Sequence, residues 1–486
     1  MMLRKLTMLV SILFTVTVTV MGATATPLPN VLVILVDDMG YGDLQSYNPK
    51  SKIPTPHLDK LARAGMRFTD AHAAGSVCHP SRYGLITGQL PFRVDYQGWR
   101  EKPSIAEDRI TIASLLKSKN YRTAMVGKWH LGFAEQGYDQ PLRGGPVDRG
   151  FDTFLGIRAS TDIPPYFYID GDRALVPPND SIGDNTSEGW TNIQGAFWRE
   201  GGIASNLQLE HVLPRFADEA VGVIRDHARL AAEDPLFLYV AFPAPHTPWL
   251  PSKEFQGTSG ASMYGDFLVM VDAMIGRVLT ALDESGLADD TLVIFSSDNG
   301  PVWYPDDVAK YDHDSVGGLR GMKGDAYEGG HRMPFIVRWP GKVSAGSRSD
   351  QLICFTDLLA TLAEVTQRKL DPDQRLDSIS FLPQLLGHAA QVGESRESLV
   401  LQSSRGLFSV RSGQWKYING LGSGGFSGRD GRNAKADRSG QQLYDLQADP
   451  GETTDLWRDR PEVAKRLEAL LQQTLQAGFW DESKRK

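Results

Sequence analysis

The chain has 486 residues, of which 41% are hydrophobic and 23% charged, and its formal net charge is −8. This composition is that of an ordinary globular protein and excludes collagen-like and disordered chains. The length suits a large core and two domains. The acidic excess argues against nucleic acid as a partner, but it is small enough to leave room for a locally basic pocket.

The first 25 residues have the pattern of a signal peptide. Arg4 and Lys5 precede an apolar run from Met8 to Met21, and Ala23-Thr24-Ala25 offers a small-residue cleavage site. The run is about 14 residues long, which is short for a membrane span, and no later segment is apolar enough to be one. We therefore expect an exported protein, periplasmic or secreted, without a stable membrane span; a retained N-terminal anchor is the alternative.

Apolar runs of strand length alternate with helical patterns as far as about residue 390. The predicted strands cover 30–36, 123–126, 235–242, 291–296 and 334–339, and the predicted helices cover 55–65, 112–120, 216–232 and 264–285. Uninterrupted apolar strands are typical of parallel sheets covered on both faces. We predict an α/β fold over 26–390, with a large mixed, mostly parallel sheet sandwiched by helices. Residues 140–205, rich in Gly, Pro, Asp and Asn, are predicted to be long surface loops.

The pattern changes near Leu399, where short strands separated by turns begin. These predicted strands cover 407–411, 415–418 and 442–446, and a predicted helix over 461–477 follows them. The segment 391–486 is therefore predicted to be a smaller C-terminal subdomain with a short antiparallel sheet and a terminal helix.

Oxygen-bearing side chains follow two of the predicted buried strands. Asp37 and Asp38 come directly after the first strand, and Asp298 and Asn299 follow a later one. Open α/β sheets bind their ligands at the carboxyl ends of strands. Adjacent carboxylates repel each other unless they are solvated or bind a cation, so a metal site is favoured over a polar turn.

Basic side chains follow other strands. Lys128 and His130 come just after the strand 123–126, and His246 lies in a proline-rich loop whose prolines fix its direction. Lys323 lies in a glycine-rich loop, where glycines allow a ligand to approach the backbone closely; a plain mobile loop is the alternative.

One short predicted helix carries both a sulfur and a permanent cation. Pro80 suits the first turn of a helix and Gly88 its end, which places Cys78 just before the helix, where unpaired N–H groups favour an anion. Arg82 falls one turn away on a similar face. A small buried cysteine is the alternative. Cys354, the other cysteine, lies in an apolar run typical of core, and the different surroundings favour separate roles over a disulfide.

Together these motifs resemble the type I sulfatases of the alkaline phosphatase superfamily. The Cys-x-Pro-Ser-Arg and Thr-Gly elements between Cys78 and Gly88 match the family signature. The blocks Asp-Asp-x-Gly, Gly-Lys-Trp-His, Pro-His-Thr-Pro, Ser-Asp-Asn-Gly and Lys-Gly-x-x-x-Glu-Gly-Gly occur in the family's order, from about Asn30 onward. One block alone is weak evidence, but their joint order is specific.

The resemblance implies an arylsulfatase-like sulfuric ester hydrolase with its catalytic domain over 26–390. In that family the cysteine is oxidised during export to Cα-formylglycine (3-oxoalanine), by a formylglycine-generating or sulfatase-maturating enzyme. The family also binds one divalent cation, usually Ca²⁺, and the implied ligands are Asp37, Asp38, Asp298, Asn299 and the modified Cys78. An all-oxygen set suits a hard ion and disfavours zinc.

The resemblance also implies the catalytic roles. Lys128 and Lys323 would hold the sulfate oxygens together with the cation, and Arg82 would orient the formylglycine hydrate whose oxygen attacks sulfur. His246 would protonate the departing alcohol. His130 would then take a proton from the second hydroxyl, which expels sulfate and regenerates the aldehyde.

The export signal favours a sulfated carbohydrate as substrate, and we expect a 6-sulfated galactosamine-type sugar. The expected substrate contacts come from the catalytic donors and from a loop ahead of Lys323, and they are Lys128, His246, Lys323, Asp312, His313 and Arg320. For the last three residues, a solvated loop is the alternative.

Two other functions stay open. A phosphatase or phosphodiesterase of the same superfamily typically has Ser or Thr as nucleophile and histidine-rich zinc sites, which Cys78 and the few metal-spaced histidines oppose. A non-catalytic binder of sulfated glycans would keep Cys78 unmodified and would show no turnover.

Overall fold

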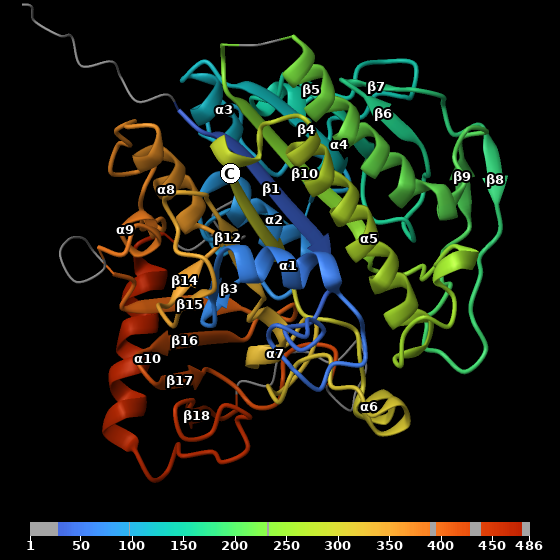
Figure 1. Cartoon of the computed structure of the whole chain (residues 1–486). Coiled ribbons are helices and arrows are strands. Elements are labelled where there is room, and N and C mark those ends of the chain that lie inside the picture. Colours follow the sequence, from blue (N-terminus) through green and yellow to red (C-terminus); the bar gives the residue numbers. More distant parts are fainter. Residues whose placement is uncertain (1–27, 97, 231–232, 389–394, 428–438, 479–486) are drawn as a thin grey trace, which may run out of the picture.

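Five parallel strands form the centre of the fold. The computed structural model describes residues 28–96, 98–230, 233–388, 395–427 and 439–478 (Figure 1), so the predicted signal peptide, 1–25, lies outside the described residues. The central strands lie in the order β11 (Thr291–Ser297), β1 (Asn30–Asp37), β10 (Leu236–Pro245), β4 (Arg122–Lys128) and β5 (Thr153–Ile157). Their parallel pairing brings their carboxyl ends to one edge of the sheet.

Shorter strands extend this sheet to ten strands. Beyond β11 lie β12 (Phe335–Arg338), β2 (Met66–Phe68) and β13 (Ser347–Ser349), and beyond β5 lie β6 (Tyr168–Asp170) and β7 (Arg173–Ala174). Both β12 and β6 run antiparallel to the central strand that they join. The predicted mixed, mostly parallel sheet is confirmed.

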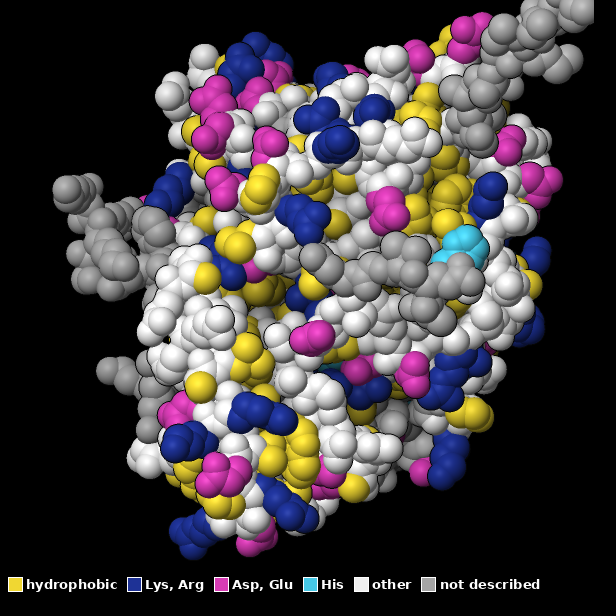
Figure 2. Space-filling model, turned by 90° about the vertical axis from the view of Figure 1, so that its left-hand side faces the viewer, with side chains coloured by type: hydrophobic (Ala, Val, Ile, Leu, Met, Phe, Trp, Pro, Cys, Tyr) yellow, Lys and Arg dark blue, Asp and Glu magenta, His cyan; other side chains and the backbone are white. Residues whose placement is uncertain are grey.

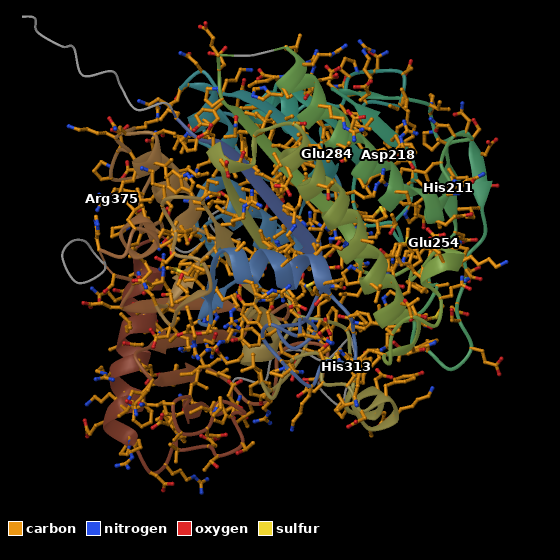
Figure 3. The ribbon with its side chains drawn as sticks, viewed as in Figure 1. His211, Asp218, Glu254, Glu284, His313 and Arg375 are labelled. Carbon is orange, nitrogen blue, oxygen red and sulfur yellow. The ribbon has the colours of Figure 1, made fainter. Side chains whose placement is uncertain are left out.

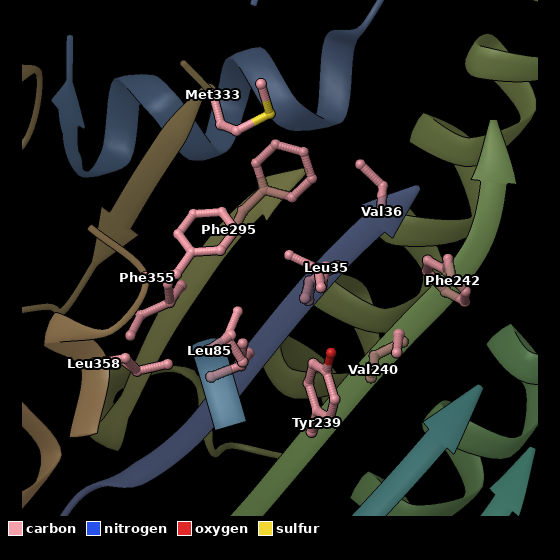
Figure 4. Close-up of a cluster of buried hydrophobic side chains, with 14 of the residues drawn as sticks. Leu35, Val36, Leu85, Tyr239, Val240, Phe242, Phe295, Met333, Phe355 and Leu358 are labelled. Carbon is pink, nitrogen blue, oxygen red and sulfur yellow. The ribbon is translucent and has the colours of Figure 1, made fainter. Parts of the chain in front are cut away.

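Helices cover both faces of the sheet. One group that packs together is α1 (Pro56–Ala64), α4 (Val212–Arg229) and α5 (Ser262–Glu284), and the other is α2 (Cys78–Thr87), α3 (Ile112–Lys117) and α8 (Asp357–Val365). Figure 4 shows Leu35 and Val36 of β1 among buried side chains of β10, β11 and α8. Because both faces of β1 are covered, its sequence is continuously apolar.

The remaining elements are short. They are β3 (Ala71–His72), β8 (Asp180–Ile182), β9 (Gly201–Ile203), β14 (Ile353–Cys354), α6 (Pro305–Tyr311), α7 (Glu328–His331) and α9 (Leu382–Leu385), with 3₁₀ turns at Pro91–Arg93, Pro146–Arg149, Leu209–His211, Lys253–Phe255 and Ala288–Asp290. The prediction of long surface loops over 140–205 is wrong in part, because β5, β6 and β7 of the main sheet lie there. Each of these strands has five residues or fewer, too few for a clear apolar pattern.

The C-terminal part forms its own antiparallel sheet, as predicted. Its strands are β15 (Ser398–Gln402), β16 (Phe408–Ser412), β17 (Trp415–Ile418) and β18 (Gln442–Asp445), and α10 (Pro461–Gln476) packs against β16 and β17. Basic and acidic side chains are interspersed on the face of the molecule shown in Figure 2. The described helices are all too short or too polar to span a bilayer.

A buried charge network joins this sheet to the main domain. Glu328 of α7 accepts hydrogen bonds from Arg411 of β16 (2.8 Å) and Lys416 of β17 (3.0 Å). Burial opposes ionisation of Glu328, but these two cations hold the pKa of its carboxyl well below the usual range. His72 and His331 bond to each other through their Nδ1 atoms beside the network, at 3.0 Å, and burial lowers the pKa of both imidazoles.

We expect this network to make the protein lose stability in acid. His72 and His331 take up protons mainly in the unfolded chain, so this pair should lower the free energy of unfolding as the pH drops below about 6.5. Glu452 of the same network, whose pKa burial raises to about 7, offsets part of this loss. Glu328, whose pKa is depressed in the fold, should add to the loss below about pH 4.3. Urea unfolding followed from pH 8 down to about pH 2 measures both effects.

The same experiment tests the network directly through substitution. Glu328→Gln leaves Arg411 and Lys416 short of a counter-charge and should lower the free energy of unfolding by about 3 kcal/mol at pH 7. Glu284→Gln is the control, because Glu284 lies exposed on α5 (Figure 3) and its change should stay within about 0.5 kcal/mol. Equal stability of the two variants would contradict the role given to Glu328.

Candidate active site

The side chains predicted at strand ends meet at the carboxyl edge of the central sheet. Asp37 ends β1, Lys128 ends β4, and His246 directly follows β10. Asp298 and Asn299 follow β11. Because these strands are parallel neighbours, side chains from four separate parts of the sequence reach one buried site.

Carboxylates and a thiol gather at the floor of this site. Ligand atoms of Asp37, Asp38, Cys78 and His246 all lie within 4.8 Å of one another. Asn299 donates from Nδ2 to Asp38 Oδ1 at 2.6 Å, while its own Oδ1 is buried and has no hydrogen-bond partner among the described residues. Buried carboxylates and an unpaired amide oxygen fit a hard divalent cation.

Arg82 holds the third carboxylate of the site. Its Nε and Nη2 lie 2.8 and 2.7 Å from Asp298 Oδ2, and its Nη1 donates to the Lys128 carbonyl at 3.0 Å. Burial and then the charge of Asp37 raise the pKa of Asp298 to about 7, against the effect of Arg82. Burial also opposes ionisation of Asp37, but Lys128, His246 and Arg82 hold its pKa well below the usual range. The carboxylates therefore repel one another strongly and depend on neighbouring cations.

Cys78 is the first residue of α2 and lies against these carboxylates, rather than just before the helix as predicted. The Cys78 thiol lies 3.2 Å from Asp37 Oδ1 in a hydrogen bond. Burial, followed by the charge of Asp37, raises the pKa of the thiol well above its ordinary value. An unmodified Cys78 thus stays protonated and is a poor nucleophile. Cys354 lies buried in β14, and both cysteines are free.

Two buried lysines reach the site from different parts of the fold: Lys128 from the end of β4 and Lys323 from the loop between α6 and α7. Lys128 donates to Asp37 Oδ2 and, at 2.6 Å, to Ser160 Oγ. Lys323 Nζ lies 2.6 and 2.7 Å from the two oxygens of Asp38. Together with Arg82 they place three cations around one small volume, which suits a tetrahedral oxyanion.

A cavity of about 450 Å³ is lined by part of this group, namely Asp38, Cys78, His246 and Lys323. Asp37, Arg82, Lys128, Asp298 and Asn299 are not among its lining residues. Its lining includes Cys78 and Lys323 at the floor, an aromatic wall with Trp99, and residues of the C-terminal subdomain. His130 also lines it, with its ring edge-on to Trp99 at a centroid distance of 4.3 Å. Burial and then the charge of Lys128 hold the pKa of His130 well below its usual range, so the neutral form of its ring is favoured.

Comparison with known proteins identifies the family. The model of the Sulfatase family matches residues 29–367. The chain belongs to the sulfatase family. This confirms the resemblance drawn from the motifs.

Individual relatives of this sulfatase match over nearly their full length. The N-acetylgalactosamine-6-O-sulfatase of Bacteroides thetaiotaomicron is 34% identical, and the match covers 91% of this chain and 92% of that protein. Arylsulfatase A of Bos taurus is 35% identical, with 94% and 89% covered. A solved structure from work on glycosaminoglycan metabolism by Bacteroides thetaiotaomicron is 32% identical with a TM-score of 0.80, and covers 92% of this chain and 99% of its own. This sulfatase is therefore a sulfuric ester hydrolase.

Three residues expected to contact the substrate lie elsewhere. Asp312 is exposed and pairs with Lys52 at 2.8 Å. His313, labelled in Figure 3, is buried and bonds Asp43 through Nε2 at 2.8 Å. Arg320 donates to the main-chain carbonyl of Glu452 at 2.6 Å. Asp312, His313 and Arg320 are absent from the lining of the cavity, and these bonds explain why: each side chain is engaged in holding loops together.

Sequence reasoning missed the loop after β5. Ser160 and Asp162 lie in this loop and line the cavity, as does Arg199, which packs against it. The strand β5 has only five residues and contains a glycine, so its sequence has no clear strand pattern to indicate that functional side chains follow its carboxyl end.

We expect Ser160→Ala to lower kcat/KM for 4-nitrophenyl sulfate about tenfold. Ser160 Oγ accepts a hydrogen bond from Lys128 Nζ and so fixes the ammonium group, and one hydrogen bond to a charged group contributes about 1.5 kcal/mol. Ser181→Ala, an exposed serine of β8, is the matched control and should behave as the unchanged enzyme. If the two variants have the same kcat/KM, Ser160 does not orient Lys128.

Proposed function

We propose that this sulfatase removes sulfate from a 6-sulfated galactosamine-type sugar by means of a formylglycine made from Cys78. The observation that carries the proposal is the buried thiol of Cys78, which lies 3.2 Å from Asp37 Oδ1 and lines the same cavity as Lys323 and Arg199. The sugar is supported by relatives named N-acetylgalactosamine-6-sulfatase, from Bacteroides thetaiotaomicron at 34% identity and from Homo sapiens at 33%.

The modification of Cys78 is supported by its surroundings. A thiol held protonated by burial and by Asp37 is a poor nucleophile, yet it lies where an anionic ester would bind. A formylglycine-generating or sulfatase-maturating enzyme would convert it while the chain is exported. The hydrated aldehyde would supply the nucleophilic oxygen that the thiol cannot.

One calcium ion is proposed for the carboxylate group. Asp37, Asp38, Asp298, Asn299 and the modified Cys78 would hold it, and the unpaired Oδ1 of Asn299 supports this. An oxygen-only set favours calcium over zinc. When bound, such an ion would act as a Lewis acid toward the sulfate oxygens.

The chain's own side chains supply binding and proton transfer. Lys128 and Lys323 would hold the sulfate oxygens, and Arg82 would orient the attacking group through its fixed position on Asp298. His246 donates from Nδ1 to the Thr247 carbonyl at 2.6 Å, which leaves Nε2 on the other side of the ring, 3.7 Å from Asp38 Oδ2. That nitrogen would protonate the leaving alcohol, and His130, which lines the same cavity, would accept a proton in the step that releases sulfate.

The site of action is proposed to be outside the cytoplasm. The signal-like pattern of residues 1–25 and a substrate of extracellular type support export to the periplasm or the medium.

We expect mass spectrometry to find formylglycine at position 78 after co-expression with a formylglycine-generating enzyme. Cys78→Ala should then lower sulfate release by more than about a thousandfold, because it removes the nucleophile. Its thermal unfolding should stay close to that of the parent, since the proposed role of the residue is chemical. An unmodified thiol in the active enzyme would refute the mechanism, and Cys354→Ala is a control that should retain activity.

We expect N-acetylgalactosamine 6-sulfate to be hydrolysed with a higher kcat/KM than its phosphate analogue, because the relatives that match over most of this chain are named sulfatases and the site has few histidine ligands for zinc. Ion chromatography measures the release of sulfate from one ester and of phosphate from the other, with calcium present and after chelation. Faster phosphate turnover would favour a phosphatase. Tight binding of the sugar without turnover by the modified protein would favour a glycan-binding protein.

A further inference from the structure

One carboxylate that lines the cavity has an oxygen without a hydrogen bond to any described residue. Asp162 is buried, with 3% of its surface exposed, and it lines the cavity. Its Oδ2 is bound by Arg199, whose Nη1 also bonds the Asp162 main-chain carbonyl at 3.0 Å. Its Oδ1 is buried and makes no hydrogen bond with any residue that the structure describes. A buried carboxylate oxygen without a hydrogen bond lowers the stability of the fold unless a ligand donates a hydrogen bond to it.

The neighbouring histidine does not satisfy this oxygen. Asp162 Oδ1 lies 3.8 Å from His246 Nδ1, which is too far for a hydrogen bond. The proton on that nitrogen is already donated to the Thr247 carbonyl at 2.6 Å. Asp162 Oδ1 is therefore free to accept a bond from a molecule in the cavity.

The position of Asp162 indicates which part of a substrate it meets. Ser160, two residues earlier in the same loop, bonds the sulfate-binding Lys128. A carboxylate repels a sulfate group, so Asp162 must face the portion of the substrate beyond the ester. That portion is the leaving alcohol, and only a hydrogen-bond donor on it matches an accepting carboxylate oxygen.

We propose that Asp162, held by Arg199, is the residue that selects a carbohydrate leaving group, by accepting a hydrogen bond from a hydroxyl or amide N–H of the sugar. This inference rests on the proposed function and extends it to the specificity of the same site. Arg199 fixes one oxygen of Asp162 and compensates the charge of the carboxylate, while the other oxygen accepts the hydrogen bond from the sugar. A simple aryl sulfate has no such donor and gains nothing from Asp162.

The test compares two kinds of substrate in matched variants. Asp162→Asn and the parent enzyme are assayed on N-acetylgalactosamine 6-sulfate and on 4-nitrophenyl sulfate. Loss of a charged acceptor should lower kcat/KM for the sugar about 10- to 100-fold, and far less for the aryl ester, so the ratio of the two values should fall at least tenfold. Asp170→Asn, an exposed carboxylate of β6, is the control for the substitution itself.

Sugar analogues identify the donor. Each analogue lacks one hydroxyl, and one carries an ester in place of the amide N–H. The parent enzyme should lose about 10- to 100-fold on one analogue, and Asp162→Asn should lose nothing further on that same analogue, because the two changes remove one interaction. The analogue that shows this coupling distinguishes a hydroxyl from the amide.

Several outcomes would overturn the inference. An equal fall on sugar and aryl esters would mean that Asp162 acts through His246, and the absence of coupling with every analogue would mean that it contacts no donor. If Asp162→Asn does not fold, Arg199→Gln replaces it, since the Arg199 side chain is 40% exposed. The ratio of kcat/KM for the sugar to that for the aryl ester should then fall about threefold or more. An unchanged ratio would overturn the inference. A parent enzyme that cleaves the aryl ester but no sulfated sugar would instead overturn the proposed function, and this inference with it.

Discussion

Mutual repulsion among three buried carboxylates is the constraint around which this active site is built. Asp37, Asp38 and Asp298 reach one point because two parallel strands end side by side there. Burial disfavours the charged form of such groups, and together with the charge of Asp37 it raises the pKa of Asp298 to about 7. Arg82, Lys128 and Lys323 each bond one of the three, so three positive charges balance three negative ones. A divalent cation added to this balanced set would leave the site positive, which suits a sulfate ester.

The small C-terminal sheet contributes to this balance through the Lys323 loop. The loop lies between the segment that joins β3 to Cys78 and the C-terminal subdomain, because the Gly324 N–H donates to the Ser76 carbonyl at 2.7 Å and the Gly324 carbonyl accepts from the Ser404 N–H at 2.9 Å. Glu328, five residues after Lys323, accepts hydrogen bonds from Arg411 and Lys416 of the sheet. The position of Lys323 therefore depends on residues far away in the sequence, and the subdomain belongs to the active site as well as to the fold.

The sequence allowed the central sheet and most of the charged site to be predicted, since long apolar strands followed by Asp, Asn, Lys and His residues leave a clear pattern. It did not allow the loop after β5 to be predicted, because a five-residue strand with a glycine has no such pattern. His313 lies close to Lys323 in the sequence, which led to the expectation that it contacts the substrate. Its ring instead bonds the buried Asp43. Which side chain of a loop faces a cavity depends on tertiary packing, and periodicity carries no information about it.

The charge balance also explains how the preference for a leaving alcohol can vary while the reaction at the sulfate ester is retained. A single charged residue added beside the carboxylates would change the pKa of every group there, since burial weakens screening. Asp162 and Arg199 form a pair that is neutral as a whole, so their charges largely cancel at the distance of the sulfate. What remains is local: Asp162 Oδ1 lies 3.8 Å from His246 Nδ1, makes no hydrogen bond with any described residue, and would accept one from the proposed sugar. A neutral pair at a strand end thus allows selection of the alcohol while the field acting on the ester stays the same.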